Sequence, residues 1–251
     1  MSDRVVCHFS CGAASAVATK LAIKKYGEVE IYRCDTGSEH TDNERFHSDC
    51  ERWFGQNINV IRSDKYANTD EVWEARQFMV SPHGAPCTGE LKKLPWMKLW
   101  QPGDVEIFGY TSSERHRVEN WKRENFERVI ECPLIDQHLT KDDCFAILAQ
   151  VGIDLPVMYG QGFRNNNCIG CVKARDSIDY WKRIRKYYPE RFEAIAQRER
   201  KLDFALNRVT KDGERRKVFL DEIAPGDPVG RDPNIQCGLF CAVEAEGMQD
   251  V

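Results

Sequence analysis

Along the first part of the chain, segments with the hydrophobic pattern of a strand alternate with segments that have the pattern of a helix. Short apolar runs, typical of buried strands, are followed by longer stretches in which apolar residues recur every three or four positions, as on one face of a helix. The pattern predicts strands at 4–10, 29–34, 58–62, 104–110 and 128–134, and helices at 13–27, 43–55 and 140–152. This alternation predicts an α/β fold, a Rossmann-like parallel sheet with helices on both faces.

The pattern changes after Gly152, and the change divides the chain into two predicted regions. Residues 1–152 contain the whole alternation of strands and helices. Residues 153–251 are expected to form a small cysteine-containing region of helical and irregular structure, with a hairpin that turns at Asp212–Gly213. Two charged helices separated by Pro189 precede this hairpin, and an irregular tail follows it.

Composition and charge narrow the classes to which the protein can belong. Its 251 residues are 41% hydrophobic and 30% charged, with a formal net charge of −4. This composition is globular, and the mild acidity argues against nucleic-acid binding driven by overall charge. The chain has no apolar run of membrane-spanning length and no secretory signal, which predicts a cytoplasmic protein without a membrane partner.

A loop of small residues joins the first predicted strand to the first helix, where α/β sheets often bind phosphate. The hydroxyls of Ser10 and Ser15 can donate to phosphate oxygens, while Gly12 and Ala13 let the backbone come close. The loop matches neither the Walker pattern nor the fingerprint GxGxxG. Such small residues are equally typical of a purely structural turn.

More polar residues follow the second and fourth predicted strands, at the same edge of the sheet as the loop. Asp35, Thr36 and Gly37 can hold a ribose, a base edge or a metal ion such as Mg²⁺, or can belong to a helix N-cap cluster. Arg115 and Arg117 suit capture of phosphate or sulfate, or line a solvated helix face. Together with the loop, these residues form the predicted nucleotide site.

Eleven cysteines are unusual in a chain expected to occupy a reducing compartment. Core packing explains four that lie in apolar strand-like or helical settings, namely Cys7, Cys34, Cys132 and Cys144. It does not explain Cys168 and Cys171, which form a CxxC in "NNNCIGC", or Cys87 at another junction between a loop and a helix. Thiolates at this spacing bind one metal centre or form a redox disulfide.

Four motifs in order, "FSCGAASAV", "DTGSEHTDNERF", "PCTGELKKLP" and "NNNCIGC", resemble the phosphoadenosine phosphosulfate reductase-like branch of the PP-loop (adenine nucleotide α-hydrolase) superfamily. The resemblance implies a Rossmann-like sheet that binds an adenine nucleotide across the first loop. The motif SGGxDS of the ATP pyrophosphatase relatives is matched only at Ser10, Gly12 and Ser15, and Ala14 replaces its acidic residue. This departure argues against ATP cleavage and suits a sulfonucleotide better.

The resemblance also implies a metal centre. In assimilatory adenylylsulfate reductases a Cys-Cys pair and a distant CxxC ligate a 4Fe–4S cluster, whereas here Thr88 stands at the second position of the pair. Cys87, Cys168 and Cys171 are therefore the implied ligands of a 4Fe–4S cluster. A zinc site or metal-free thiols are the alternatives.

The tail motif "CGLFC" resembles the reductase motif Cys-Gly-Leu-His, whose cysteine attacks the sulfur of the sulfonucleotide. Cys237 matches this nucleophile, Phe240 replaces the histidine, and Cys241 is an additional thiol expected to help complete the metal site. The alternative is that Cys237 itself is the fourth metal ligand.

Three functions remain open from the sequence. The first is a sulfonucleotide reductase-type enzyme in which a thioredoxin-like thiol donor releases sulfite. The second is an ATP-dependent sulfur transferase that thiolates a nucleobase in tRNA or DNA, which the basic and aromatic segment "YWKRIRKYYPERF" favours. The third is a non-enzymatic, metal-stabilised protein that binds an adenine nucleotide.

Overall fold

The chain divides into two compact units that are interleaved in sequence. The structure is a computed structural model that describes residues 4–211, 213–230, 232, 233, 235 and 237. The first unit comprises the chain up to residue 36 together with 41–65 and 91–157. The second comprises 37–40, 66–90 and the chain from 158 onward. The chain passes from the first unit to the second for the last time between residues 157 and 158, close to the predicted boundary between 152 and 153.

The first unit is built on a five-stranded sheet in which every strand pair is parallel. In sheet order the strands are β3 (Ile58–Ile61), β2 (Glu30–Cys34), β1 (Val5–His8), β4 (Val105–Ile107) and β5 (Val129–Glu131). The helices are α1 (Ala13–Tyr26), α2 (Asn43–Phe54), α5 (Leu94–Met97), η2 (Ser112–Glu114), α6 (Arg115–Glu124), α7 (Pro133–Asp136) and α8 (Lys141–Gln150). Each strand lies inside its predicted range, and the predicted α/β class is confirmed.

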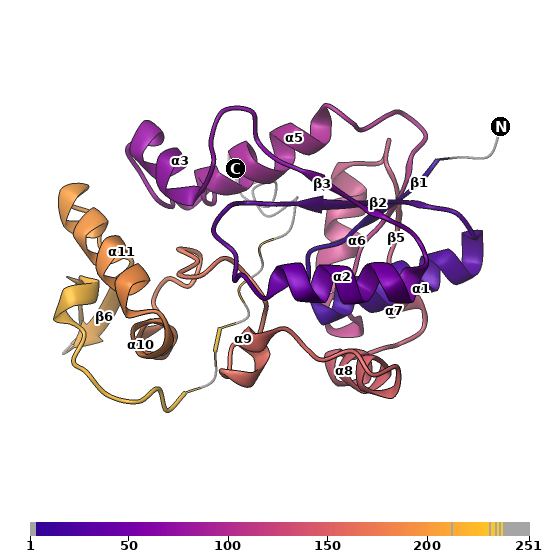
Figure 1. Cartoon of the computed structure of the whole chain (residues 1–251). Helices are drawn as coiled ribbons and strands as arrows, with labels where there is room; N and C mark the ends of the chain where they lie inside the picture. Colours follow the sequence, from indigo (N-terminus) through magenta and orange to yellow (C-terminus); the bar gives the residue numbers. More distant parts are fainter. Residues whose placement is uncertain (1–3, 212, 231, 234, 236, 238–251) are drawn as a thin grey trace. The chain divides into compact units, whose positions relative to one another are not determined.

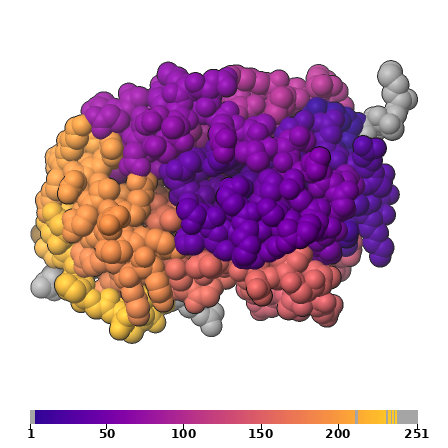
Figure 2. All heavy atoms as spheres, in the orientation of Figure 1, coloured from indigo at the N-terminus to yellow at the C-terminus, as the bar shows by residue number. Residues whose placement is uncertain are grey.

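Helices α1 and α2 run side by side along one face of this sheet (Figure 1). Phe9 points toward this face, with its ring centroid 6.2 Å from that of Phe46 and 5.9 Å from that of Phe54, both on α2. Helices α7 and α8 pack against α1, and the segment that contains α8 reaches the surface of the unit in Figure 2. This face is therefore covered by an apolar helical layer.

Helices α5 and α6 cover the opposite face. His8 precedes Phe9 in sequence and so points the other way, because successive side chains of a strand alternate between faces. Its ring centroid lies 4.6 Å from that of Trp96 on α5 and 4.2 Å from that of Phe108. Phe108 in turn contacts Trp121 of α6, with the centroids 5.9 Å apart. The prediction of helices on both faces is confirmed.

Two helix ends are capped by residues only a few positions away in the sequence. Gly27 ends α1 with a φ of 80°, and its N–H donates to Ile23 O at 2.8 Å. At the start of α8, Asp143 N–H donates to Thr140 Oγ1 at 3.2 Å while Thr140 N–H donates to Asp143 Oδ2 at 2.8 Å. This reciprocal pair is a capping box in which Asp replaces the more common Glu.

The second unit consists of short helices and one hairpin. Its elements are α3 (Thr69–Arg76), α4 (Pro86–Thr88), α9 (Val157–Gly160), α10 (Ile178–Tyr187), α11 (Pro189–Lys201), β6 (Asn207–Lys211), β7 (Glu214–Val218) and η3 (Leu220–Glu222), with the π-helical turn η1 (Gly89–Lys93) after α4. The predicted hairpin and the two helices beside Pro189 are present. The core of this unit contains Trp73, Tyr180, Trp181 and Phe192, none more than 1% exposed.

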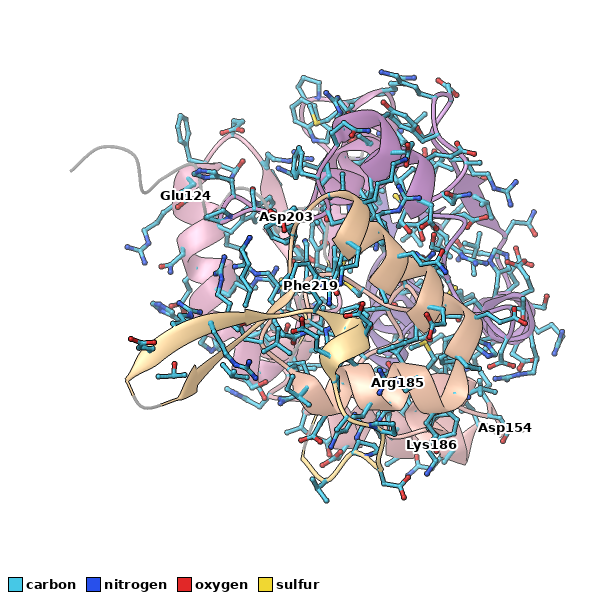
Figure 3. The ribbon with its side chains drawn as sticks, turned by 90° about the vertical axis from the view of Figure 1, so that its left-hand side faces the viewer. Glu124, Asp154, Arg185, Lys186, Asp203 and Phe219 are labelled. Atoms are coloured by element: carbon cyan, nitrogen blue, oxygen red, sulfur yellow. The ribbon has the colours of Figure 1, made fainter. Side chains whose placement is uncertain are left out.

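Arg185 fastens α10 to the segment that follows the hairpin. Figure 3 shows Arg185 on α10 together with the hairpin of β6 and β7 and Phe219 at its end. The guanidinium donates to Ile223 O at 2.6 Å and to Leu220 O at 3.0 Å, and it lies 4.0 Å from the ring centroid of Phe192. Leu220 O also accepts from Ile223 N–H at 3.1 Å within the turn, so Arg185 adds a second donor to this carbonyl and holds the end of η3 against α10.

No helix within the described part of the chain is long and apolar enough to cross a membrane.

Candidate functional site

The loop Ser10–Ser15 in the first unit is held in shape by its own hydroxyls. Ser15 Oγ donates to Gly12 O at 2.9 Å and accepts from Ser10 N–H at 3.1 Å. The Ser10 and Ser15 hydroxyls are 3.1 Å apart. Gly12 is the N-cap of α1 and has no side chain with which to cap it, and the first turn of the helix contains no acidic residue. The loop therefore presents a helix N-terminus of the kind that favours an anion.

Gly109 brings the end of β4 against this loop. A Cβ atom at this position would lie 2.6 Å from Ser15 N and 2.8 Å from Ala14 C, which are backbone atoms. Only glycine permits this approach without moving the loop. Gly109 was not among the residues predicted for the site, although a glycine near the end of the predicted strand 104–110 was the available signal.

Asp35 and Thr36 follow β2 at the carboxyl edge of the sheet. Asp35 N–H donates to Ile61 O at 2.9 Å, and its carboxylate pairs with Arg62 at 2.7 Å. Thr36 is buried. Asp42, in the same segment, is the N-cap residue of α2, as the N-cap alternative expects, although its side chain makes no capping bond to the helix.

Gly37 belongs to the second unit. Its φ is 62°, and a Cβ there would lie 2.0 Å from Ala67 O. This steric requirement by itself explains a glycine at the position, so a role in ribose or base binding stays a prediction.

The two candidate arginines lie in the first turns of α6, after β4. Arg115 is exposed and donates to Ile135 O at 3.0 Å. Arg117 lies 3.8 Å from Glu114 and places its guanidinium carbon 5.0 Å from the ring centroid of Tyr110. Both side chains are thus ordered by neighbours in the first unit, and their role as anion ligands stays a prediction.

A buried polar network that the sequence analysis did not anticipate lies behind the loop. Glu106 is fully buried and accepts from Trp96 Nε1 at 3.0 Å and from Arg128 Nε at 2.7 Å, with His8 Nε2 also 3.0 Å away. Burial lowers the pKa of His8, so its ring is neutral at physiological pH. Burial acts to raise the pKa of Glu106, but hydrogen bonds from His8 and Arg128 outweigh it and hold this pKa below its ordinary value. The network ties β1, β4 and β5 together.

Four cysteines of the second unit share one neighbourhood. Cys87 lies in α4, Cys168 and Cys171 in the loop before α10, and Cys237 in the tail. The pKa of the Cys171 thiol is raised well above its ordinary value. The largest cause is a hydrogen bond with Cys237, followed by burial and by the negative charges that Cys237, Cys168 and Cys87 carry as thiolates. The structure thus brings two cysteines from distant segments, Cys87 and Cys237, to the CxxC.

Backbone N–H groups of the CxxC loop are hydrogen-bonded to neighbouring segments. Gly170, between the two cysteines, has a φ of 72°. Ile169 N–H donates to Ser38 O at 2.9 Å, and Cys171 N–H donates to the Tyr180 hydroxyl oxygen at 2.8 Å. Both thiols are therefore presented from a fixed loop.

The cysteine neighbourhood does not have the arrangement of a preformed metal site. Among the described residues, no three His, Cys, Asp or Glu side chains are arranged as ligands of one ion. Cys241, the remaining predicted ligand, lies outside the described residues. The metal site predicted from the sequence therefore stays a prediction.

Three of the four cysteines assigned to core packing, Cys7, Cys132 and Cys144, are buried. Burial raises the pKa of Cys132 to about 12 and that of Cys144 to about 11, and Cys7 is fully buried. Cys34 is only partly buried, and its Sγ lies 3.9 Å from Lys92 O. Buried thiols with raised pKa values are poor nucleophiles, which fits a packing role.

Comparison with known proteins identifies a family and similar solved structures. A family model described as the phosphoadenosine phosphosulfate reductase domain matches residues 4–176. No curated protein matches the chain. Among solved structures, the chain is similar to a crystal structure of phosphoadenylyl-sulfate (PAPS) reductase from Candida auris in a phosphate complex. That match has 10% sequence identity and a TM-score of 0.49, and covers 66% of this chain and 81% of that chain.

Proposed function

Because the chain belongs to the phosphoadenosine phosphosulfate reductase family, we propose that it is an enzyme that binds an adenine sulfonucleotide and carries out thiol-dependent sulfur chemistry on it. The observation that carries this proposal is the extent of the family match, residues 4–176. The matched segment contains the loop Ser10–Ser15, Cys87 and the whole CxxC. The candidate nucleotide loop and three of the four clustered cysteines thus lie inside the family domain.

The loop and the residues around it are the proposed nucleotide site. The amides at the start of α1 and the hydroxyls of Ser10 and Ser15 bind the phosphates. Ala14 leaves the first turn of α1 without an acidic side chain, so nothing there repels a sulfonucleotide that carries several negative charges. Asp35 and Thr36 contact the ribose or base, and Arg115 or Arg117 adds a cation for the sulfate or phosphate.

The cysteine cluster is the proposed metal centre. Its donor set consists of thiols alone, which suits a 4Fe–4S cluster or a zinc ion better than a hard cation such as Mg²⁺. When bound, an iron–sulfur cluster supplies electron-transfer chemistry, whereas zinc supplies a closed structural site. Cys87, Cys168 and Cys171 hold the group, and the Tyr180 hydroxyl orients the CxxC backbone.

The reaction then follows from thiol chemistry at the sulfur. A tail thiolate attacks the sulfur, the bond from sulfur to the phosphate oxygen breaks, and its electron pair leaves with the nucleotide. A dithiol donor of the thioredoxin class next attacks the resulting cysteine S-sulfonate, sulfite leaves with the electron pair of the S–S bond, and the donor reduces the mixed disulfide. The sequence assigns the attack to Cys237.

The test is a comparison of two assays on the anaerobically purified full chain. We expect sulfite from adenylyl sulfate or its 3′-phosphorylated form in the presence of a dithiol reductant, and no pyrophosphate from ATP with or without tRNA or DNA. Gly12→Val combined with Ser15→Ala should abolish nucleotide binding in calorimetry. Ser48→Ala, an exposed serine of α2, is the matched control. Pyrophosphate release without sulfite would reject the proposal and favour the sulfur transferase.

A further inference from the structure

The hairpin of β6 and β7 in the second unit carries a concentration of positive charge. Residues 207–218 contain five Lys or Arg and two Asp or Glu, in a chain whose formal net charge is −4. We propose that this hairpin is a docking surface for double-stranded DNA, and that its cations bind the phosphate backbone of the duplex. The inference goes beyond the proposed function and does not depend on it.

The two strands of the hairpin divide their side chains between two faces. Cross-strand partners share one face, and successive residues alternate between faces. Asn207 and Val218 are partners at the base of the hairpin and are buried, so their face packs on the core of the unit. We call the opposite face the outer face. It carries two directly opposed and exposed pairs, Arg208 with Lys217 and Thr210 with Arg215. These four positions supply three cations and a hydroxyl, and neither an acidic nor an apolar side chain.

Folding alone does not favour this arrangement of charge. Arg208 and Lys217 lie directly opposite each other, where two like charges repel and destabilise a sheet. Two carboxylates lie near the outer face, Asp176 at 3.3 Å from Arg215 and Asp203 at 4.0 Å from Lys217. Exposed pairs of this kind contribute little to stability, so a phosphate can take the place of the carboxylate. A bound polyanion therefore relieves a repulsion that the free hairpin maintains.

The base of the hairpin is fixed, so its cations are held in place. Glu199 is fully buried on α11 and accepts from Leu206 N–H before β6 and from Leu220 N–H after β7, at 2.5 and 2.6 Å. Asp176 accepts from Arg208 N–H at 2.6 Å. Figure 3 shows the two strands extending from this base away from α10 and α11. A preorganised arm of this kind lowers the entropy cost of binding a partner.

The width and the side chains of the hairpin favour duplex DNA over other polyanions. The major groove of B-form DNA is about 12 Å wide and admits a two-stranded β-ribbon. The major groove of double-stranded RNA is too deep and narrow for side chains to read. Proteins that bind single strands stack bases on aromatic side chains, and proteins that lie in a membrane surface insert apolar ones. The outer face has neither aromatic nor apolar side chains.

The basic and aromatic segment 180–192, which the sequence offered for nucleic acid, does not provide such a surface. Its Tyr180, Trp181 and Phe192 belong to the core of the second unit. Arg183 is buried in an ion pair, and Arg185 donates to backbone carbonyls. The cations of the hairpin, in contrast, are exposed.

The experiment measures binding of the full-length chain to a short fluorescent DNA duplex, by anisotropy at several salt concentrations. Three phosphate contacts should give the logarithm of the affinity a slope of about −3 against the logarithm of the salt concentration, at ~0.9 per contact. Arg208→Gln combined with Lys217→Gln should weaken binding by at least about tenfold and reduce the size of this slope by about 2. Lys186→Gln, which removes an exposed cation of α10, is the matched control and should change neither.

Two further measurements separate the role of the surface from the stability of the fold. The double variant should unfold at a urea concentration equal to or above that of the wild type, because it removes the repulsion between opposed cations. Glu214→Gln removes an exposed acidic side chain of β7 and should strengthen DNA binding.

Three outcomes would overturn the inference. The first is a wild-type chain that does not bind the duplex at low salt, and the second is equal binding by the double variant and Lys186→Gln. The third is tighter binding to tRNA, to single-stranded DNA or to phosphatidylserine vesicles than to the duplex. No sulfonucleotide is present in these assays. A failed sulfite assay therefore rejects the proposed function and leaves the DNA surface standing, and a failed DNA assay leaves the proposed function untouched.

Discussion

At the scale of single residues, Gly109 is a position in the first unit where a side chain would collide with the backbone of the loop Ser10–Ser15. A Cβ there meets Ser15 N at 2.6 Å, and the backbone of the loop cannot yield as a flexible side chain can. We expect Gly109→Ala to lower the free energy of unfolding by about 1–3 kcal/mol, the usual range for overpacking. It should also weaken adenine-nucleotide binding, because the loop must shift.

Urea unfolding and calorimetry measure these two effects. Gly160→Ala is the control, because a Cβ there meets nothing within 4 Å. If the two variants have the same free energy of unfolding and the same nucleotide affinity, the close approach of Gly109 to the loop contributes to neither.

Glu199 is a buried carboxylate that makes stability depend on pH. It is fully buried on α11 and accepts from Leu206 N–H and Leu220 N–H at 2.5 and 2.6 Å. Burial raises its pKa to about 7. The folded state therefore binds this proton more tightly than the unfolded state, whose carboxyl titrates near ~4.3. The stabilisation is complete below the unfolded pKa and is lost as pH rises to about 7.

The measurement is the free energy of unfolding of the wild type relative to Glu199→Gln, which does not titrate. This difference should fall by about 3 kcal/mol between pH 4.5 and 7, at ~1.4 kcal/mol per pKa unit, and stay level above. Glu193→Gln changes an exposed carboxyl of the same helix and is the control. If the difference in free energy of unfolding between the wild type and Glu199→Gln does not vary with pH, the pKa of Glu199 is not raised in the folded state.

At the scale of elements, the tail is joined to α10 by one buried and one exposed ion pair. Arg183 and Asp232 are 9% and 3% exposed, whereas Lys186 and Asp227 are 50% and 78% exposed. Removing one partner of a buried pair leaves an uncompensated charge and typically costs about 3–5 kcal/mol. An exposed pair contributes roughly 0–1 kcal/mol. Arg183→Met should therefore destabilise the protein far more than Lys186→Met.

The same two variants test the position of the tail. Arg183→Met should speed alkylation of Cys237 under native conditions, and Lys186→Met should leave it unchanged. If both variants unfold at the same urea concentration as the wild type, the buried pair does not anchor the tail.

At the scale of the whole molecule, each unit has its own core and its own candidate chemistry. The first unit holds the nucleotide loop and the second holds the cysteine cluster. The second unit draws residues 37–40 and 66–90 out of the first half of the sequence, and the second of these segments carries Cys87. Two units that are interleaved in this way cannot be described by a single boundary, such as the one between residues 152 and 153. The reason is that a compact unit is defined by contacts between segments that are distant in sequence.

The sequence by itself determined the α/β class, the five strands and the family. These are local properties: the period of apolar residues follows from the geometry of strand and helix, and the loop Ser10–Ser15 and the CxxC are short continuous motifs. The capping box at Thr140 and the helix end at Gly27 were predictable for the same reason, since capping involves neighbours a few residues apart.

Only the tertiary structure decided how distant residues meet. The burial of Glu106 and its bonds to His8 and Arg128 depend on the order of β1, β4 and β5 in the sheet. The requirement for glycine at 109 arises from a backbone 94 positions away, and no local pattern encodes it. Cys237 meets Thr88 across 149 positions because the Asn165 and Asn167 amides capture the tail. Hydrogen bonds and packing between remote segments act only in the folded chain, which is why the partner of the CxxC had to be read from the structure.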